Sequence, residues 1–130
     1  MRQLARRAAL TVGIAVTALA VTAAAQGGEA KATKQVTVGD HGTAPSGYFT
    51  PRSVTIHRGS SVNWTWAADS ALQHGVYVTK APKGVDKSRY RSDVQGPPAE
   101  FHRKFTKPGV YRFICPIHSA IMHMKVTVKG

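Results

Sequence analysis

The chain has 130 residues, which is enough for one domain. It carries 18 Lys and Arg against six Asp and Glu, an excess that suits nucleic acid, an anionic cell surface or an acidic protein as partner. We expect no nucleic-acid partner, because the sequence shows neither a basic stripe interleaved with aromatic residues nor a nucleic-acid reading motif. Solvated lysines that keep a small protein soluble explain the charge equally well.

Residues 1–25 have the pattern of a signal peptide. Three arginines precede an uncharged, alanine-rich run that ends in small residues at 23–25, a cleavage pattern. We predict export to the periplasm, the cell envelope or the extracellular space. The Arg6-Arg7 pair also permits the twin-arginine route. A retained anchor is the alternative, since residues 8–25 are just long enough to span a bilayer, and only then would the protein contact a membrane.

Removal of the leader lowers the formal net charge from +12 to +9, because three arginines and no acidic residue are lost. A Gly/Ala/Lys linker at 26–34 then precedes one domain at 35–130. Short alternating segments in this domain indicate strands, at 35–39, 53–57, 61–66, 74–78, 99–105, 109–115 and 124–128.

Pro- and Gly-rich turn signals separate these segments, and no long helical periodicity occurs outside the leader. The pattern is typical of an all-β sandwich or barrel, and we predict a sandwich of about seven or eight strands. The stretch 80–98 is irregular and cationic, and it is either a loose surface insertion, the default interpretation, or a docking surface.

Cys115 is the only cysteine. Small exported domains use cysteines in pairs, as disulfides, so this one is an inert buried thiol, an intermolecular disulfide or a metal ligand. Two histidines and two methionines lie within the next nine positions. A metal would protect a thiol in an oxidising compartment, which favours the third interpretation.

Strand alternation predicts where these side chains lie. Cys115 comes at the inward-facing end of its strand, His118 lies in the short loop that follows, and Met122 begins the inward face of the next strand. The three side chains therefore converge at one end of the sandwich. Upstream, His74 is the best candidate for a fourth ligand, because it opens a strand directly after a polar turn.

A thiolate, two imidazoles and a distant thioether form the trigonal His₂Cys site with a weak axial Met, which suits copper in electron transfer. Met122 is favoured over Met124 as the thioether, because Met124 lies one pleat deeper and is expected to fill the core. The other histidines are expected to face solvent: His41, His57, His102 and His123.

The chain resembles the plastocyanin/amicyanin-type cupredoxins, the blue (type 1) copper proteins. The segments "YFTPRSVTIHRGSSVNWTW", His74, "FTKPGVYRFICPIH" and "MHMKVTV" follow the order and spacing of that family, over roughly residues 35–129. The resemblance implies a Greek-key β-sandwich and one mononuclear copper that cycles between Cu(I) and Cu(II). It also implies single-electron transfer between redox partner proteins. The implied ligands are His74, Cys115, His118 and Met122.

Three positions depart from the family pattern. Gly75 stands where the family often has an Asn that braces the ligand loop, Pro116 follows the cysteine directly, and Met124 replaces a glycine. None of these removes a ligand, but each affects the tuning of the site.

The sequence disfavours some alternatives to electron transfer and leaves others open. Zinc is disfavoured by the methionine, and we expect no enzyme because the six acidic residues are scattered without a carboxylate pair. A copper carrier or scavenger, or a metal-free adhesion module, would use the same fold. We expect a monomer whose redox partners are acidic, given its positive charge.

Overall fold

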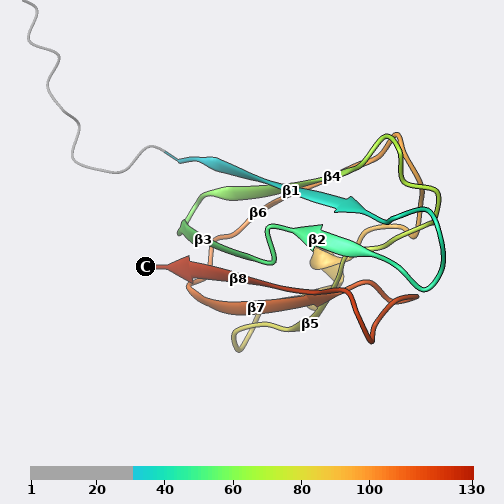
Figure 1. The fold of residues 1–130 in the computed structure, drawn as a ribbon. Coiled ribbons are helices and arrows are strands. Elements are labelled where there is room, and N and C mark those ends of the chain that lie inside the picture. Colours follow the sequence, from blue (N-terminus) through green and yellow to red (C-terminus); the bar gives the residue numbers. More distant parts are fainter. Residues whose placement is uncertain (1–30) are drawn as a thin grey trace, which may run out of the picture.

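The computed structural model describes residues 31–130, so the predicted signal peptide and most of the linker lie outside the described residues. The described chain forms two four-stranded sheets that pack face to face (Figure 1). This confirms the predicted all-β sandwich. The strands are β1 (Thr33–Gly39), β2 (Tyr48–Thr50), β3 (Ser53–His57), β4 (Ser61–Trp66), β5 (Tyr77–Lys80), β6 (Glu100–Lys104), β7 (Gly109–Ile114) and β8 (His123–Lys129).

One sheet has the order β2-β1-β4-β6 and the other β3-β8-β7-β5. β1 runs parallel to β4, with Val38 opposite Trp66, and β7 runs antiparallel to β8, with Ile114 opposite His123. The loops after β1 and β4 and the loop between β7 and β8 therefore gather at one end of the sandwich (Figure 1).

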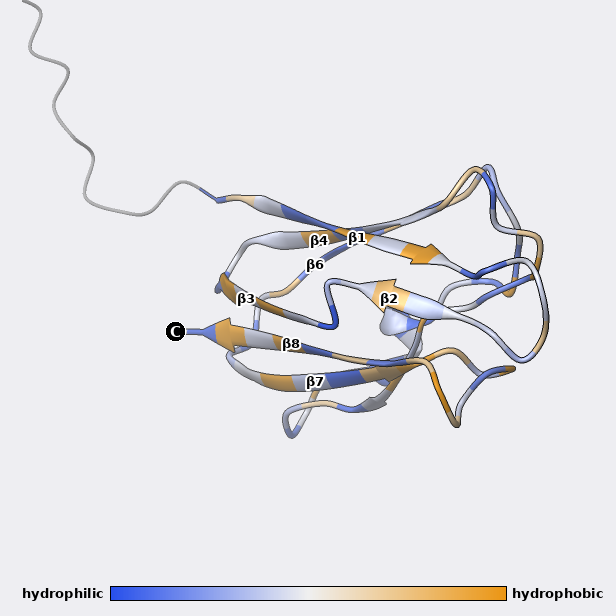
Figure 2. Ribbon diagram, in the orientation of Figure 1, coloured by the Kyte–Doolittle hydropathy of each residue, from blue (hydrophilic) through white to orange (hydrophobic). Residues whose placement is uncertain are grey.

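The core lies between the sheets because inward side chains alternate with outward ones. Figure 2 shows the same alternation as hydrophobic and hydrophilic bands along β7 and β8. Trp64, fully buried on β4, has its ring centroid 5.5 Å from that of Phe101 in the same sheet and 5.1 Å from that of Phe113 in the facing sheet. Burial of each such large apolar side chain contributes roughly 1.5–3 kcal/mol to the free energy of folding.

The structure corrects the expectation of a loose insertion at 80–98. A 3₁₀-helix, Lys87–Tyr90, lies in this stretch, and the Tyr90 ring packs 5.0 Å from Phe105 and 5.4 Å from Tyr111. Tyr90 therefore anchors this stretch to the core, while most of its other residues stay at the surface. Within residues 31–130, no helix has the length and apolar character needed to cross a bilayer.

Two strand boundaries also differ from expectation. β2 was not predicted as a separate strand, because three residues are too few to show alternation. The expected strand at 74–78 begins only at Tyr77, and His74 instead forms an isolated bridge to Gln95.

Candidate metal centre

The loop between β7 and β8 carries three of the four predicted ligands. The N–H of Cys115 donates to the carbonyl of Met122 at 3.2 Å. The N–H groups of His118 and Met122 donate to the carbonyls of Cys115 and His118, at 3.2 and 2.9 Å. These backbone bonds close the loop on itself, so the positions of the three side chains are set by the fold.

His74 enters from the other side of the site. Its N–H donates to the carbonyl of Gln95 at 2.9 Å, and its carbonyl accepts from the N–H of Gln95 at 3.0 Å and from the indole N–H of Trp66 at 3.1 Å. Both backbone groups of His74 are thus hydrogen-bonded, so the backbone position from which the fully buried imidazole extends is fixed.

Three donor atoms form a small triangle. The Nδ1 atoms of His74 and His118 are 3.2 Å apart, and the Sγ of Cys115 lies 4.0 and 3.6 Å from them, respectively. The point equidistant from the corners of this triangle lies about 2.1 Å from each of them, the length of a metal–nitrogen bond and slightly short of a metal–thiolate bond. The three side chains therefore form a group of suitable size for one metal ion.

Met122 borders the same space. Its side chain is fully buried, and a β-carbon added at Gly47 would overlap its Sδ while lying 3.2 Å from Cε1 of the His74 ring. The lack of a side chain at residue 47 is what lets the thioether and the imidazole approach each other. The set of donors is soft sulfur and imidazole, which suits copper.

The second methionine sulfur is engaged elsewhere. The indole N–H of Trp64 donates to the Sδ of Met124 at 3.1 Å, inside the core. Met124 is 4 % exposed and lies opposite Phe113 in the sheet. Its sulfur therefore satisfies a buried donor and takes no part in the donor cluster.

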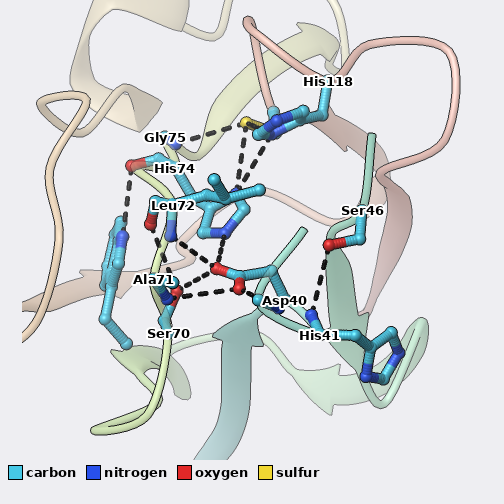
Figure 3. Close-up of polar contacts among 12 residues, drawn as sticks. Asp40, His41, Ser46, Ser70, Ala71, Leu72, His74, Gly75 and His118 are labelled. Carbon is cyan, nitrogen blue, oxygen red and sulfur yellow. Dashed lines mark hydrogen bonds and ion pairs between the residues drawn. The ribbon is translucent and has the colours of Figure 1, made fainter. Parts of the chain in front are cut away.

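A carboxylate orients the His74 ring (Figure 3). The Nε2 of His74 lies 2.9 Å from Oδ2 of Asp40, and both side chains are fully buried. Because a carboxylate accepts the Nε2 proton, Nδ1 is left as the lone-pair nitrogen that faces the other donors. The remaining donors to Asp40 come from the neighbouring loops: the hydroxyl of Ser70 and the N–H groups of Gly42, Ala71 and Leu72.

The electrostatics favour the protonation states that a metal needs. Burial raises the pKa of Asp40, but the hydrogen bonds from Ser70, His74 and the backbone outweigh it and hold that pKa well below its usual range. Burial, and then the adjacent His74, lower the pKa of His118. Asp40 is therefore ionised and His118 neutral at neutral pH, and a neutral imidazole is the form that binds a metal.

Two of the departures from the family pattern have a structural explanation. The N–H of Gly75 donates to the Sγ of Cys115 at 3.5 Å, and a β-carbon at residue 75 would come within 3.1 Å of Pro116. Gly75 and Pro116 thus pack against each other beside the sulfur. The His74 ring is held on its other side by Asp40.

The four predicted ligands lie at one end of the sandwich, and the other histidines do not join them. His41, His57, His102 and His123 are exposed and outside the cluster. Sequence reasoning missed Asp40 and Gly47. Asp40 directly follows β1, which runs parallel to β4. Only this pairing brings Asp40 next to the loop after β4 that carries His74, so the sequence alone does not point to it.

Comparison with known proteins agrees with this geometry. Residues 34–129 match the family model described as copper binding proteins, plastocyanin/azurin family. A search of curated proteins finds no match.

Solved structures share the fold. The oxidised form of plastocyanin from Dryopteris crassirhizoma is 28 % identical, with a TM-score of 0.60 over 73 % of this chain and 99 % of that one. Pseudoazurin from Methylobacterium extorquens AM1 is 28 % identical, with a TM-score of 0.59 over 75 % of this chain and 76 % of that one. Amicyanin from Paracoccus versutus, 23 % identical, has the same fold with a TM-score of 0.59 over 75 % and 81 % of the two chains.

The chain therefore belongs to the copper-binding plastocyanin/azurin family and has the cupredoxin fold, a Greek-key β-sandwich. Its expected cofactor is copper, and the side chains at the end of the sandwich are positioned as a type 1 copper site.

Proposed function

We propose that His74, Cys115, His118 and Met122 bind one copper ion and that the protein transfers single electrons between redox partners. The observation that carries this proposal is the preorganised donor triangle: two Nδ1 atoms and one Sγ lie 3.2–4.0 Å apart, held by backbone hydrogen bonds. Little rearrangement is needed to accommodate either oxidation state, which keeps the barrier to electron transfer small.

Copper bound here supplies a one-electron change between Cu(I) and Cu(II). Cysteine and methionine sulfur favour Cu(I), whereas imidazole is acceptable to both states. Asp40 keeps the His74 ring in one tautomer. The sheets exclude water from His74, Cys115 and Met122, which are all fully buried.

His118 is the ligand side chain nearest to solvent. It is half-buried, and Ile117 and Ile121 beside it are 53 % and 41 % exposed. Electrons are expected to leave and enter at this end, where a partner can approach the imidazole.

A copper carrier would need exposed, exchangeable ligands, and the burial of three of the four favours electron transfer over that role. A catalytic metal site keeps an open position, and a set of four donors in this space leaves none, so we do not assign an enzymatic activity. Release of copper to a strong chelator separates the two binding functions: an electron carrier releases it slowly, and a metal carrier rapidly.

The cationic start and apolar run of residues 1–25 support export to the periplasm, the envelope or the extracellular space. The mass of the protein recovered from fractionated cells tests this, since cleavage after residue 25 removes the leader. A mass that includes the leader would mean a retained anchor.

The test of the copper site is addition of Cu(II) to the purified protein. An intense visible charge-transfer band is expected, because a short copper–thiolate bond mixes sulfur and metal orbitals. Cys115→Ser should remove the band and leave the β-type circular dichroism intact. His123→Ala, at an exposed histidine outside the cluster, is the matched control and should keep the band. A coloured Cys115→Ser protein would refute the assignment.

A further inference from the structure

We propose that the outer face of the β3-β8-β7-β5 sheet docks the acidic surface of a protein partner, close to the copper ligands. We call this surface the cationic face and define it by Arg52, Lys80, Arg112 and Lys125. The inference deepens the proposed function, because it names where a redox partner binds and which chemistry the partner presents.

Three cations of this face stand directly opposite one another across neighbouring strands. Lys80 of β5 pairs with Arg112 of β7, and Arg112 pairs with Lys125 of β8. All three point away from the core, since Tyr111 and Phe113 occupy the inward positions on either side of Arg112. Like charges at such cross-strand positions repel each other and destabilise the sheet. An anionic ligand removes that repulsion.

No counter-charge is supplied from within the face. The strands β3, β5, β7 and β8 contain no Asp or Glu. Within residues 31–130, the ion pair present is the buried one of Asp40 with His74, and Lys80, Arg112 and Lys125 have none. Their charges are therefore available to a partner.

The opposite sheet shows that this arrangement is local. Its central strand β4 contains no charged residue, and Gln35 of β1 and Asn63 of β4 hydrogen bond at 3.1 Å. The outward residues are Thr33, Gln35, Thr37, Ser61, Asn63 and Thr65. The cations of that sheet, Lys34, Arg103 and Lys104, each pair with an uncharged residue of β4, whereas Lys80, Arg112 and Lys125 stand opposite one another in one row. In Figure 2 the hydrophilic bands of β7 and β8 lie within this sheet.

The face is hollowed beside the metal site. A depression of about 280 Å³ is lined by Arg52, Arg112 and Lys125 together with Ile114 and His123. Ile114 directly precedes Cys115, and His123 directly follows Met122. A carboxylate seated among these cations therefore brings the partner against the backbone that carries both sulfur ligands. This docking site is separate from the surface formed by the exposed isoleucines around His118.

A protein fits the face better than a nucleic acid does. Sequence-tolerant binding of single strands relies on exposed aromatic rings on which bases stack. The aromatic side chain on this face is Tyr77, which is half-buried and has the Arg91 guanidinium 5.2 Å above its ring. Carboxylates need only the charges and the depression.

Titration of octaglutamate into isotope-labelled, copper-loaded, reduced protein at low ionic strength tests the proposal. Amide shifts are expected on β5, β7 and β8, and the affinity should fall steeply with added salt. Arg112→Gln/Lys125→Gln should weaken binding about 1.5- to 5-fold for each charge removed, and Arg52→Gln, a loop change, should weaken it by one such step. Lys34→Gln/Lys104→Gln removes the same charge from the other sheet and should leave the affinity unchanged.

Equal weakening by both double variants would mean that only net charge matters, and would overturn the proposal. Shifts confined to another face would do the same, as would tighter binding of octathymidylate than of octaglutamate to this face. Because removal of like charges relieves repulsion, Arg112→Gln/Lys125→Gln should unfold at no lower temperature than the wild type. Visible absorption of the same samples after reoxidation to Cu(II) reports copper separately, so a failure of the copper site leaves the peptide titration to decide the docking surface.

Discussion

Asp40 and His74, 34 residues apart in the sequence, form a fully buried pair in which the carboxylate Oδ2 lies 2.9 Å from the imidazole Nε2. The carboxylate also ties together the loops that follow β1 and β4, through the hydroxyl of Ser70 and the N–H groups of Gly42, Ala71 and Leu72. One side chain thus fixes both the ring orientation and the loop that carries it.

We predict that Asp40→Asn keeps the copper band and raises the reduction potential. The carboxylate stabilises Cu(II) more than Cu(I). If the carboxylate and the extra positive charge of Cu(II) lie about 8 Å apart, they attract each other by about 2 kcal/mol at an effective dielectric constant near 20. The amide N–H₂ would also face backbone donors, at a cost of about 1–3 kcal/mol in stability. Asp69→Asn, at an exposed acid in the neighbouring loop, is the control. Cyclic voltammetry decides it, and equal shifts in the two variants would contradict a direct effect of Asp40.

The two methionines are predicted to respond differently to the same substitution. Met122→Leu removes the thioether beside His74 and should raise the potential, because Cu(I) is satisfied by the thiolate and two imidazoles, whereas the more highly charged Cu(II) gains more from a fourth donor. Met124→Leu leaves the Trp64 indole N–H without its acceptor, so it should destabilise the fold by about 1–2 kcal/mol with little effect on the potential. Voltammetry and thermal unfolding of both variants test this. A larger potential shift for Met124→Leu than for Met122→Leu would mean that Met122 is the wrong choice of sulfur ligand.

Gly47 is predicted to control the position of the axial sulfur. In Gly47→Ala the new methyl group overlaps the Sδ of Met122, so the thioether must move. We expect a changed visible spectrum and a loss of about 1–3 kcal/mol in stability from overpacking. Gly96→Ala is the matched control, because a β-carbon at residue 96 meets nothing within 4 Å. Identical spectra for the two variants would show that Met122 does not border the metal.

Alkaline pH should destabilise the protein through Tyr111. Burial, and then the neighbouring Tyr90, raise the pKa of Tyr111 to about 12, and its hydroxyl donates to the carbonyl of Lys107 at 2.7 Å. The folded pKa lies above the unfolded value of about 10. The stability contributed by the neutral phenol is therefore fully present below pH about 10 and is lost as the pH rises through about 12.

Tyr111→Phe has no such group to ionise. The lost hydrogen bond lowers the free energy of unfolding of the variant by the same amount at every pH. Between pH 10 and 12, the free energy of unfolding of the wild type should fall by about 2 kcal/mol more than that of the variant. Chemical denaturation at a series of pH values measures both curves, and parallel curves would contradict the prediction.

The alternation of the sequence predicted most of the fold. Strands such as 61–66 and 109–115 bury every second residue, and a period of two leaves only one face that can enter a core. The same parity placed Cys115 inward and His102 outward. The spacing from Cys115 to His118 and Met122 predicted that these three side chains lie together, because a short loop between adjacent strands keeps its residues close to one another.

Boundaries and packed irregular segments were harder to predict. The stretch 80–98 lacks periodicity, yet Tyr90 reaches the core because Phe105 and Tyr111 provide a ring-sized contact. His74 was expected within a strand, but its backbone pairs with Gln95, 21 residues further along the chain, which local propensity does not encode.

By itself, the sequence determined the all-β sandwich, the inward face of each long strand and the soft donor set near its end, because these follow from side-chain parity and chemistry over short spans. Only the tertiary structure decided that Asp40 holds His74, that Gly47 makes room for Met122, and that Trp64 engages Met124. It also placed Lys80, Arg112 and Lys125 in one row. Each of these contacts joins residues far apart in the chain, and each depends on strand order and register, which alternation leaves open.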